Sequence, residues 1–193
     1  MSRTVSARLS TATRSGHGGQ RVHDLRLGTV PSYVDTTRSP HNDIVIRPPT
    51  VEAIADAALE RRQARYERGD MTRQPRSIRR DGTVAIEGII TFGVEAQPVI
   101  DALSHDEQVQ RYRAAAEAVA AEVGTDLVGL VIHRDEGAPH AHLVLSGYAP
   151  DGRAISRNLT KGCLSLAQDA AATAYKDLGI SRGKKIGARI ADG

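Results

Sequence analysis

Alternation of apolar and polar residues predicts several β-strands along the chain. Residues 4–9 (TVSARL) alternate, and residues 83–93 (TVAIEGIITFG) alternate and then become continuously apolar. Residues 126–135 (DLVGLVIHRD) and 140–148 (HAHLVLSGY) are two further apolar runs. Only the short sequence EGAP separates them, so they are expected to pair as an antiparallel hairpin.

Helical spacing with end signals predicts three helices, over residues 50–69, 104–124 and 163–179. Thr50 is a plausible N-cap of the first, and Ser104 with Glu107 forms a capping box at the start of the second. The resulting order β-α-β-α-β-β-α predicts an α+β fold, an antiparallel sheet with helices packed on one face.

Residues 11–49 lack sustained periodicity and are rich in Gly, Ser, Thr, Pro and Arg. A loop of this length inside a compact domain is usually functional or disordered. We interpret residues 1–193 as a single domain, with residues 1–49 as an N-terminal strand and functional loop. Residues 180–193 form a basic tail, and the abrupt stop at ARIADG leads us to expect a missing C-terminal region.

Composition narrows the class of protein. Aromatic residues make up 3% of the chain and Trp is absent, so the core is expected to consist of Ala, Val, Leu and Ile. The net charge of +3 permits a polyanionic partner without requiring one. A single cysteine, Cys163, excludes an internal disulfide and suits a reducing compartment. The polar N-terminus and the lack of a long apolar run favour a cytoplasmic protein without a membrane partner.

Three of the chain's seven histidines lie within residues 133–142. His140 and His142 lie roughly 6.5 Å apart on one face of a strand, so both imidazoles can reach one metal ion. His133 ends the adjacent strand and can supply a third nitrogen, which leaves open positions on a divalent cation for oxygen ligands. Ordinary strand-edge histidines are the alternative. Three of them on one face favour metal binding.

The sequence HRDEGAPHAH (residues 133–142) resembles the HxDExxPHxH motif of Mob/Pre (MobV-type) plasmid mobilisation relaxases, within the HUH endonuclease superfamily. GGQRVHDLR (residues 18–26) and RSPHND (residues 38–43) are similar to two earlier motifs of that family. IRRDGTVAIEGIIT (residues 78–91) resembles a third, with Glu87 in register. The resemblance spans most of residues 16–160, and its histidine motif is the specific part.

The resemblance implies a relaxase catalytic domain with a ferredoxin-like palm. Such enzymes nick one DNA strand at a plasmid transfer origin, remain joined to the 5′ phosphate and later religate the ends. Carried over, the nucleophile is His23 and the metal ligands are His133, His140 and His142, for one Mn²⁺ or Mg²⁺ ion. Supporting catalytic residues are Arg26, Asp135 and Glu136. A neutral imidazole can form a phosphoramidate with the 5′ phosphate.

The chain departs from the family's pattern beside the proposed nucleophile. Asp24 and Leu25 replace residues that are more often Asn and Glu, and Asp24 is expected to raise the pKa of His23. No role is expected for His41. Two other residues of the early loop, His17 and Tyr33, are alternative nucleophiles. Tyr112 and Tyr175 are expected to be packing residues.

Basic residues cluster in four places, and loop clusters of this kind are candidates for phosphate contacts. The expected partner is single-stranded or supercoiled DNA at a transfer origin, with a hairpin. The resemblance also implies a bacterial cytoplasm and coupling to a type IV secretion system through a missing C-terminal region. The alternatives are an HUH replication initiator, a transposase-like nickase and a non-catalytic sequence-specific DNA-binding module. The predicted DNA-binding residues are Arg21, Arg38, Asn42, Arg79, Arg80, Arg157, Lys161, Arg182, Lys184 and Lys185.

Overall fold

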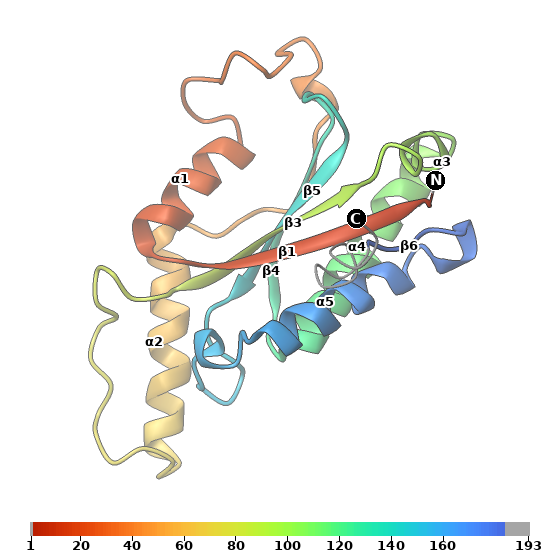
Figure 1. Cartoon of the computed structure of the whole chain (residues 1–193). Helices are drawn as coiled ribbons and strands as arrows, with labels where there is room; N and C mark the ends of the chain where they lie inside the picture. The colour runs from red at the N-terminus through yellow and green to blue at the C-terminus, as the bar shows by residue number, and fades with distance from the viewer. Residues whose placement is uncertain (1, 184–193) are drawn as a thin grey trace, which may run out of the picture.

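A six-stranded sheet with the strand order β2-β4-β5-β3-β1-β6 lies at the centre of the protein (Figure 1). The computed structural model describes residues 2–183, so Lys184 and Lys185 lie outside the described residues. Neighbouring strands are antiparallel except β1 and β6, which are parallel. The strands are β1 (Thr4–Ala12), β2 (Asp43–Ile46), β3 (Ala85–Phe92), β4 (Leu127–His133), β5 (His140–Ser146) and β6 (Ser181–Arg182).

In the described part of the chain, residues 2–183, five α-helices and three short 3₁₀ helices connect these strands. The predicted cap at Thr50 is confirmed, since its side chain accepts from the backbone N–H of Ala53, and so is the capping box of Ser104 and Glu107. The α-helices are α1 (Arg14–Asp24), α2 (Val51–Glu67), α3 (Gln97–Asp101), α4 (His105–Val123) and α5 (Lys161–Thr173). The 3₁₀ helices are η1 (Ser39–His41), η2 (Ile155–Arg157) and η3 (Lys176–Leu178). None of the helices within residues 2–183 combines the length and apolarity needed to cross a bilayer.

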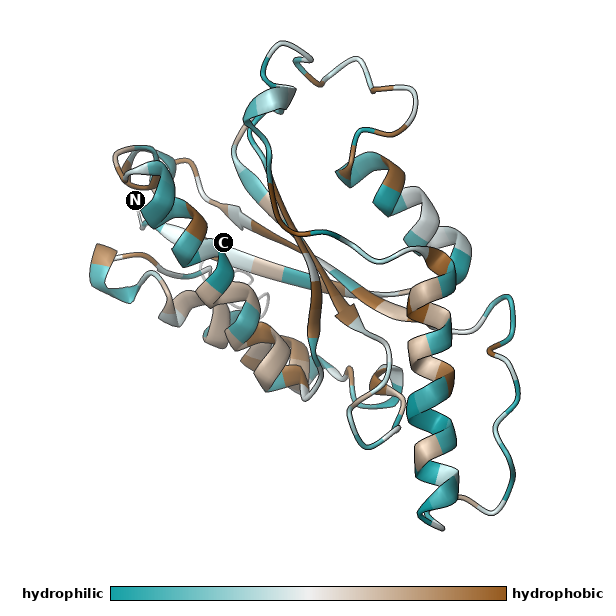
Figure 2. Cartoon of the chain, turned by 180° about the vertical axis from the view of Figure 1, so that it is seen from behind, coloured by the Kyte–Doolittle hydropathy of each residue, from teal (hydrophilic) through white to brown (hydrophobic). Residues whose placement is uncertain are grey.

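Helices cover both faces of the sheet, so the prediction of helices on one face is incomplete. Leu143 packs in the main core with residues of α4 and α5, whereas its neighbour Val144 packs with Ile54 and Ala58 of α2. Successive strand residues point to opposite faces. The continuous apolar run in β5 is therefore buried on both sides. Figure 2 shows the apolar central strands and the predominantly hydrophilic loop that follows α2.

The segment predicted as a long loop contains α1 and β2, which the predicted order lacks along with α3 and β6. Helix α1 carries three glycines, each of which costs up to about 1 kcal/mol relative to Ala in a helix and blurs the apolar period. Thr13 caps its start by accepting from Gly16 N. A Cβ on Gly18 would lie 3.2 Å from Val51 Cγ2, so glycine allows α1 to lie close to α2.

Candidate metal centre and active site

The β4–β5 hairpin brings the three predicted ligand histidines together. His133 pairs directly with His140 at its end, and His142 lies opposite Val131 one step further in. The ring centroids of His133 lie 5.3 Å from His140 and 4.9 Å from His142, and those of His140 and His142 lie 4.9 Å apart. The Nε2 atoms of His140 and His142 are 3.1 Å apart. Two nitrogens at this distance converge on one point.

The outward-facing ring nitrogens of His133 and His140 are bound to backbone carbonyls. His133 Nε2 is 3.2 Å from the carbonyl oxygen of Asp24, and His140 Nδ1 is 2.9 Å from that of Ala138. Because a carbonyl oxygen only accepts, these nitrogens carry the protons. His133 Nδ1 is then left unprotonated, buried and without a hydrogen-bond partner within residues 2–183. This arrangement is typical of metal-binding imidazoles.

Burial keeps two of these histidines neutral. Desolvation, followed by the positive charge of Arg26, lowers the pKa of His133 to about 4. Desolvation and the neighbouring histidines lower the pKa of His142 to about 2. Neutral imidazole is the form that binds metal ions.

His23 lies on the last turn of α1 rather than in a loop, and its ring joins the cluster. Its centroid is 5.0 Å from that of His133 and 5.3 Å from that of His142. Its Nε2 is 3.4 Å from Glu136 Oε1, and its Nδ1 is 3.2 Å from Arg26 Nη1. His23 is therefore in contact with His133 and His142, which lie more than 100 residues away in the sequence.

The expectation that Asp24 raises the pKa of His23 is wrong. Burial, and then the charge of Arg26, lowers the pKa of His23. The Asp24 carboxyl instead accepts from Gln20 Nε2 at 2.6 Å and lies 3.9 Å from His142 Nδ1. Burial raises the pKa of this carboxyl to about 7.

Arg26 joins the end of α1 to the turn of the hairpin. Its Nε and Nη2 donate to the two carboxylate oxygens of Asp135 at 3.0 and 2.6 Å, and Nη2 also donates to Glu136 Oε1 at 2.9 Å. Asp135 accepts further hydrogen bonds from Ser39 Oγ at 2.6 Å and Asn42 Nδ2 at 2.8 Å. Burial of Asp135 opposes its ionisation, but these donors outweigh it and hold its pKa well below the usual range.

The predicted DNA-binding residues divide into two groups. Three of them make contacts within the fold: Arg21 Nε donates to the Pro48 carbonyl at 3.2 Å, Asn42 Oδ1 accepts from Arg134 N at 2.7 Å, and Arg182 Nη1 pairs with Asp169 at 2.9 Å. The remaining described members are exposed: Arg38, Arg79, Arg80, Arg157 and Lys161. The three residues with contacts inside the fold are half-buried, whereas the other five present exposed side chains to solvent.

The alternative nucleophiles lie in different surroundings. His17 is fully buried, with Nδ1 3.0 Å from Glu87 Oε1 and Nε2 2.9 Å from the Pro49 carbonyl, so neither nitrogen can attack a phosphate. Tyr33 is 63% exposed at the mouth of the cleft that holds the histidines. The cleft, about 370 Å³ in volume, is lined by His23, Tyr33, Ile89, Thr91, Phe92, His140, His142 and residues 136–139.

The remaining aromatic and histidine candidates lie away from this cleft. Tyr112 and Tyr175 are buried in the main core, as predicted. His41 lines a separate pocket beside His105 and Arg134.

Several contacts that support the site were not found from the sequence. Gln20, Asp24 and Ser39 contact the candidate ligands or the carboxylate that holds the turn. The four-residue spacing of Gln20 and Asp24 is meaningful only on a helix, and the glycines of α1 hide that helix. Ser39 lies in the RSPHND stretch, but its partner Asp135 is 96 residues away.

The fold is that of a relaxase domain, and the histidine cluster lies in its cleft. Two crystal structures of the MobM relaxase domain (MOBV; Mob_Pre), Mn-bound and in complex with 22-nucleotide plasmid pMV158 oriT DNA, are similar to the chain. The structure determined at pH 5.5 matches this chain with a TM-score of 0.76 and 20% sequence identity, and the match covers 98% of each chain. The structure determined at pH 4.6 gives a TM-score of 0.75 and 20% sequence identity, and the match covers 98% of this chain and 100% of the MobM chain. The MobM relaxase domain bound to 26-nucleotide pMV158 oriT DNA gives a TM-score of 0.68 and 19% sequence identity, and the match covers 94% of this chain and 91% of the MobM chain.

The chain belongs to the Mob_Pre family, whose description is plasmid recombination enzyme, and the family model matches residues 54–189. A search of curated protein sequences finds no match. The family membership confirms the resemblance inferred from the motifs, and the α+β fold class is confirmed as well. The matched range contains the histidine motif, whereas His23 precedes it.

Proposed function

We propose that this protein is a metal-dependent DNA relaxase that nicks one strand at a plasmid transfer origin through His23. The observation that carries the proposal is the contact of the His23 ring with those of His133 and His142. A nucleophile and a metal centre must both reach one phosphate, and the closeness of these three rings supports a shared site for the two. The relaxase domains of similar fold were crystallised with oriT DNA and manganese.

The donor set fits one divalent cation. His133, His140 and His142 would hold Mn²⁺ or Mg²⁺. Ligand atoms of His133, His140 and Glu136 lie within 4.8 Å of one another, and His142 Nε2 is 3.1 Å from His140 Nε2. Glu136 can add an oxygen, since Oε1 is 3.5 Å from His133 Nδ1 and Oε2 is 3.8 Å from His140 Nε2. When bound, the cation supplies positive charge to the non-bridging oxygens of the phosphate.

His23 is suited to attack because its lowered pKa keeps the imidazole neutral near pH 7. One ring nitrogen forms a bond to phosphorus as the bond to the 3′ oxygen breaks and that oxygen leaves with the electron pair. Glu136 Oε1, 3.4 Å from His23 Nε2, lies where it can accept the ring proton, and transfer of this proton to the leaving 3′ oxygen gives the 3′ hydroxyl. Arg26 orients the ring and its backbone carbonyl, to which Nη1 donates at 3.0 Å.

The product is a phosphoramidate that joins His23 to the 5′ phosphate. The released 3′ hydroxyl can attack it and restore the phosphodiester, so religation needs no nucleotide cofactor. Single-stranded or supercoiled origin DNA, including a hairpin, is the proposed substrate. The exposed residues Arg38, Arg79, Arg80, Arg157 and Lys161 are candidates for contacts with its phosphates.

The test is detection of the covalent adduct. The protein is incubated with a single-stranded oligonucleotide of the cognate origin and Mn²⁺, separated under denaturing conditions and analysed by peptide mapping. We expect an adduct on the peptide that contains His23, absent in His23→Ala and retained in Tyr33→Phe. An adduct that survives His23→Ala but disappears in Tyr33→Phe would assign the nucleophile to Tyr33. Tight binding without any adduct would support a non-catalytic DNA-binding module.

A further inference from the structure

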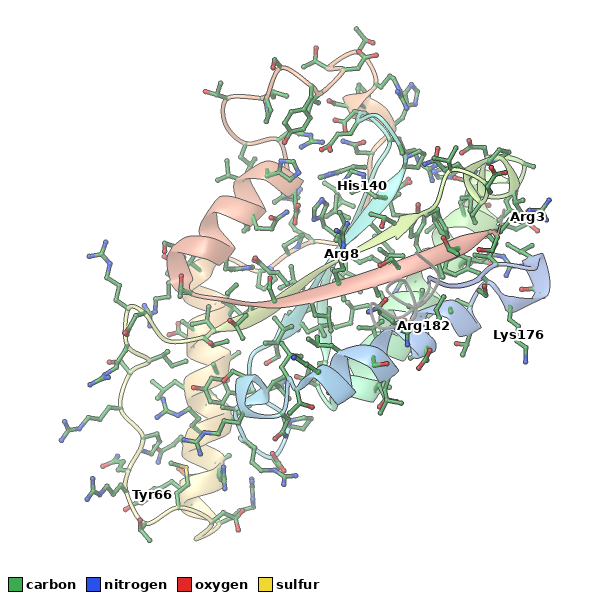
Figure 3. The ribbon with its side chains drawn as sticks, viewed as in Figure 1. Arg3, Arg8, Tyr66, His140, Lys176 and Arg182 are labelled. Carbon is green, nitrogen blue, oxygen red and sulfur yellow. The ribbon has the colours of Figure 1, made fainter. Side chains whose placement is uncertain are left out.

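The sheet face that carries His140 and His142 continues beyond the cleft onto β3 and β1. His142 pairs with Ile89 of β3, and Ile89 pairs with Arg8 of β1. Residues paired directly across strands share one face of a sheet. With strands about 4.8 Å apart, the Cα atom of Arg8 lies roughly 10 Å from that of His142. Figure 3 labels Arg8 and His140 on this part of the sheet.

This part of β1 is open on the side of the histidines. Helix α1 contacts β3 through His17 and β5 through Gln20, but Arg8 and Ser10 are exposed and Ser6 is half-buried. The alternate residues of β1, Val5 and Ala7, point into the main core. A partly exposed strip therefore runs from the histidine cleft over Ile89 of β3 to Arg8.

Arg8 carries an unneutralised positive charge at the β1 end of this strip. Among the described residues 2–183, no carboxylate forms an ion pair with Arg8. The nearby acids are already paired, Glu87 with His17 at 3.0 Å and Glu136 with Arg26 at 2.9 Å. An exposed guanidinium without a carboxylate partner is well suited to bind a phosphate through two parallel N–H groups.

We propose that Arg8 binds a backbone phosphate of the DNA strand whose scissile phosphate occupies the histidine cleft. The strand then crosses the sheet from β5 over β3 to β1. At about 3.4 Å per stacked nucleotide, the 10 Å between the two positions spans about three nucleotides. Arg8 is in this sense a positioning residue, and the inference rests on the proposed function. It concerns DNA binding alone, so it can be tested without cleavage.

The first experiment measures binding of a fluorescein-labelled dT20 oligonucleotide by anisotropy, between about 50 and 200 mM salt. We expect Arg8→Gln to bind about tenfold more weakly. The slope of log K against log salt should decrease by about 0.7, the value for one phosphate contact to a single strand. The control is Arg113→Gln on α4, whose side chain is 43% exposed and lies 3.8 Å from Glu117, and it should match the wild type. An unchanged slope in Arg8→Gln would overturn the proposal.

A second experiment separates a phosphate contact from a structural role of Arg8. A single neutral methylphosphonate linkage is moved stepwise along the origin oligonucleotide. We expect the wild type to lose affinity at a linkage that causes no further loss in Arg8→Gln, while other linkages weaken both proteins. Arg8→Lys should retain the salt slope because it keeps the charge. Equal losses at every linkage in both proteins would show that Arg8 contacts no phosphate, whether or not the protein cleaves DNA.

Discussion

The guanidinium of Arg26 donates to both carboxylate oxygens of Asp135, from Nε to Oδ2 at 3.0 Å and from Nη2 to Oδ1 at 2.6 Å. This two-point contact holds the end of α1, where His23 lies, against the turn between His133 and His140. The two side chains are 109 residues apart in sequence and almost completely buried. The relative position of the proposed nucleophile and the metal centre therefore depends on this pair.

Replacing Arg26 should destabilise the protein more than breaking an ion pair at the surface. Arg26→Met leaves Asp135 buried without its cation, and we expect the free energy of unfolding to decrease by about 3 kcal/mol. The matched control is Arg111→Met, because Arg111 contacts both carboxylate oxygens of Asp177, which is 64% exposed. Loss of that pair should cost less than about 1 kcal/mol. Urea denaturation measures both values, and equal losses would contradict the assigned role of Arg26.

Removing one of the proposed ligand histidines should separate catalysis from DNA binding. We expect His140→Ala or His142→Ala to lose Mn²⁺ binding and adduct formation while keeping most of the affinity for origin DNA, since phosphate contacts supply that affinity. His105→Ala is the control, because this exposed histidine pairs with Asp43 outside the cleft. Calorimetric titration with Mn²⁺ and anisotropy with labelled DNA check the two properties. A parallel loss of both would mean that these histidines maintain the fold.

The hairpin could be predicted from the sequence because its determinants are local. Period-two alternation places His140 and His142 on one face, and the short turn specifies that His133 lies beside them. The histidine cluster follows from these two facts alone. The ends of α2 and α4 were predictable for the same reason, since caps depend on residues three positions apart.

The rest of the site depends on contacts that no local pattern contains. Helix α1 is stabilised by packing of Gly18 against Val51 and by the buried contact of His17 with Glu87, both of which need the folded sheet. Without α1, the sequence could not reveal that Gln20 faces His142. The position of Arg8 likewise depends on the register of three strands that are far apart in sequence.

The stability of the metal-free protein should decrease in mild acid. The pKa of His133 is about 4 in the folded protein, compared with an ordinary value of 6.5. As the pH falls from about 6.5 to 4, the unfolded chain therefore takes up a proton that the folded protein does not. Through His133 alone, the free energy of unfolding should decrease by an amount of the order of 2–3 kcal/mol. The pKa of His142, about 2 when folded, adds to this decrease.

Two variants isolate this contribution. In His133→Asn, the free energy of unfolding should decrease less between about pH 6.5 and 4 than in the wild type. Thermal denaturation with a chelator present measures this. Asp24 acts in the opposite direction, because its pKa is about 7 when folded and 3.8 ordinarily, so it stabilises the protein as the pH falls from 7 to 4. In Asp24→Asn, the free energy of unfolding should therefore decrease more steeply with falling pH than in the wild type. Identical slopes in the wild type and His133→Asn would show that His133 is not desolvated as the structure indicates.

Gln20 should tune the metal site without contacting the metal. Its Nε2 atom donates to Asp24 Oδ1 at 2.6 Å and lies 3.1 Å from His142 Nδ1. Turning the amide over puts its oxygen in this position, where it can accept both the hydroxyl proton of a protonated Asp24 and the Nδ1 proton that His142 carries when its Nε2 binds a metal. Outer hydrogen-bond partners of ligand histidines typically change metal affinity 10- to 100-fold when removed. We expect Gln20→Ala to bind Mn²⁺ about tenfold more weakly, as measured by calorimetry. The control is Gln63→Ala on α2, whose amide bonds only Glu67 at an exposed position. If both variants bound Mn²⁺ like the wild type, the orientation of His142 would have to be maintained by the strand alone.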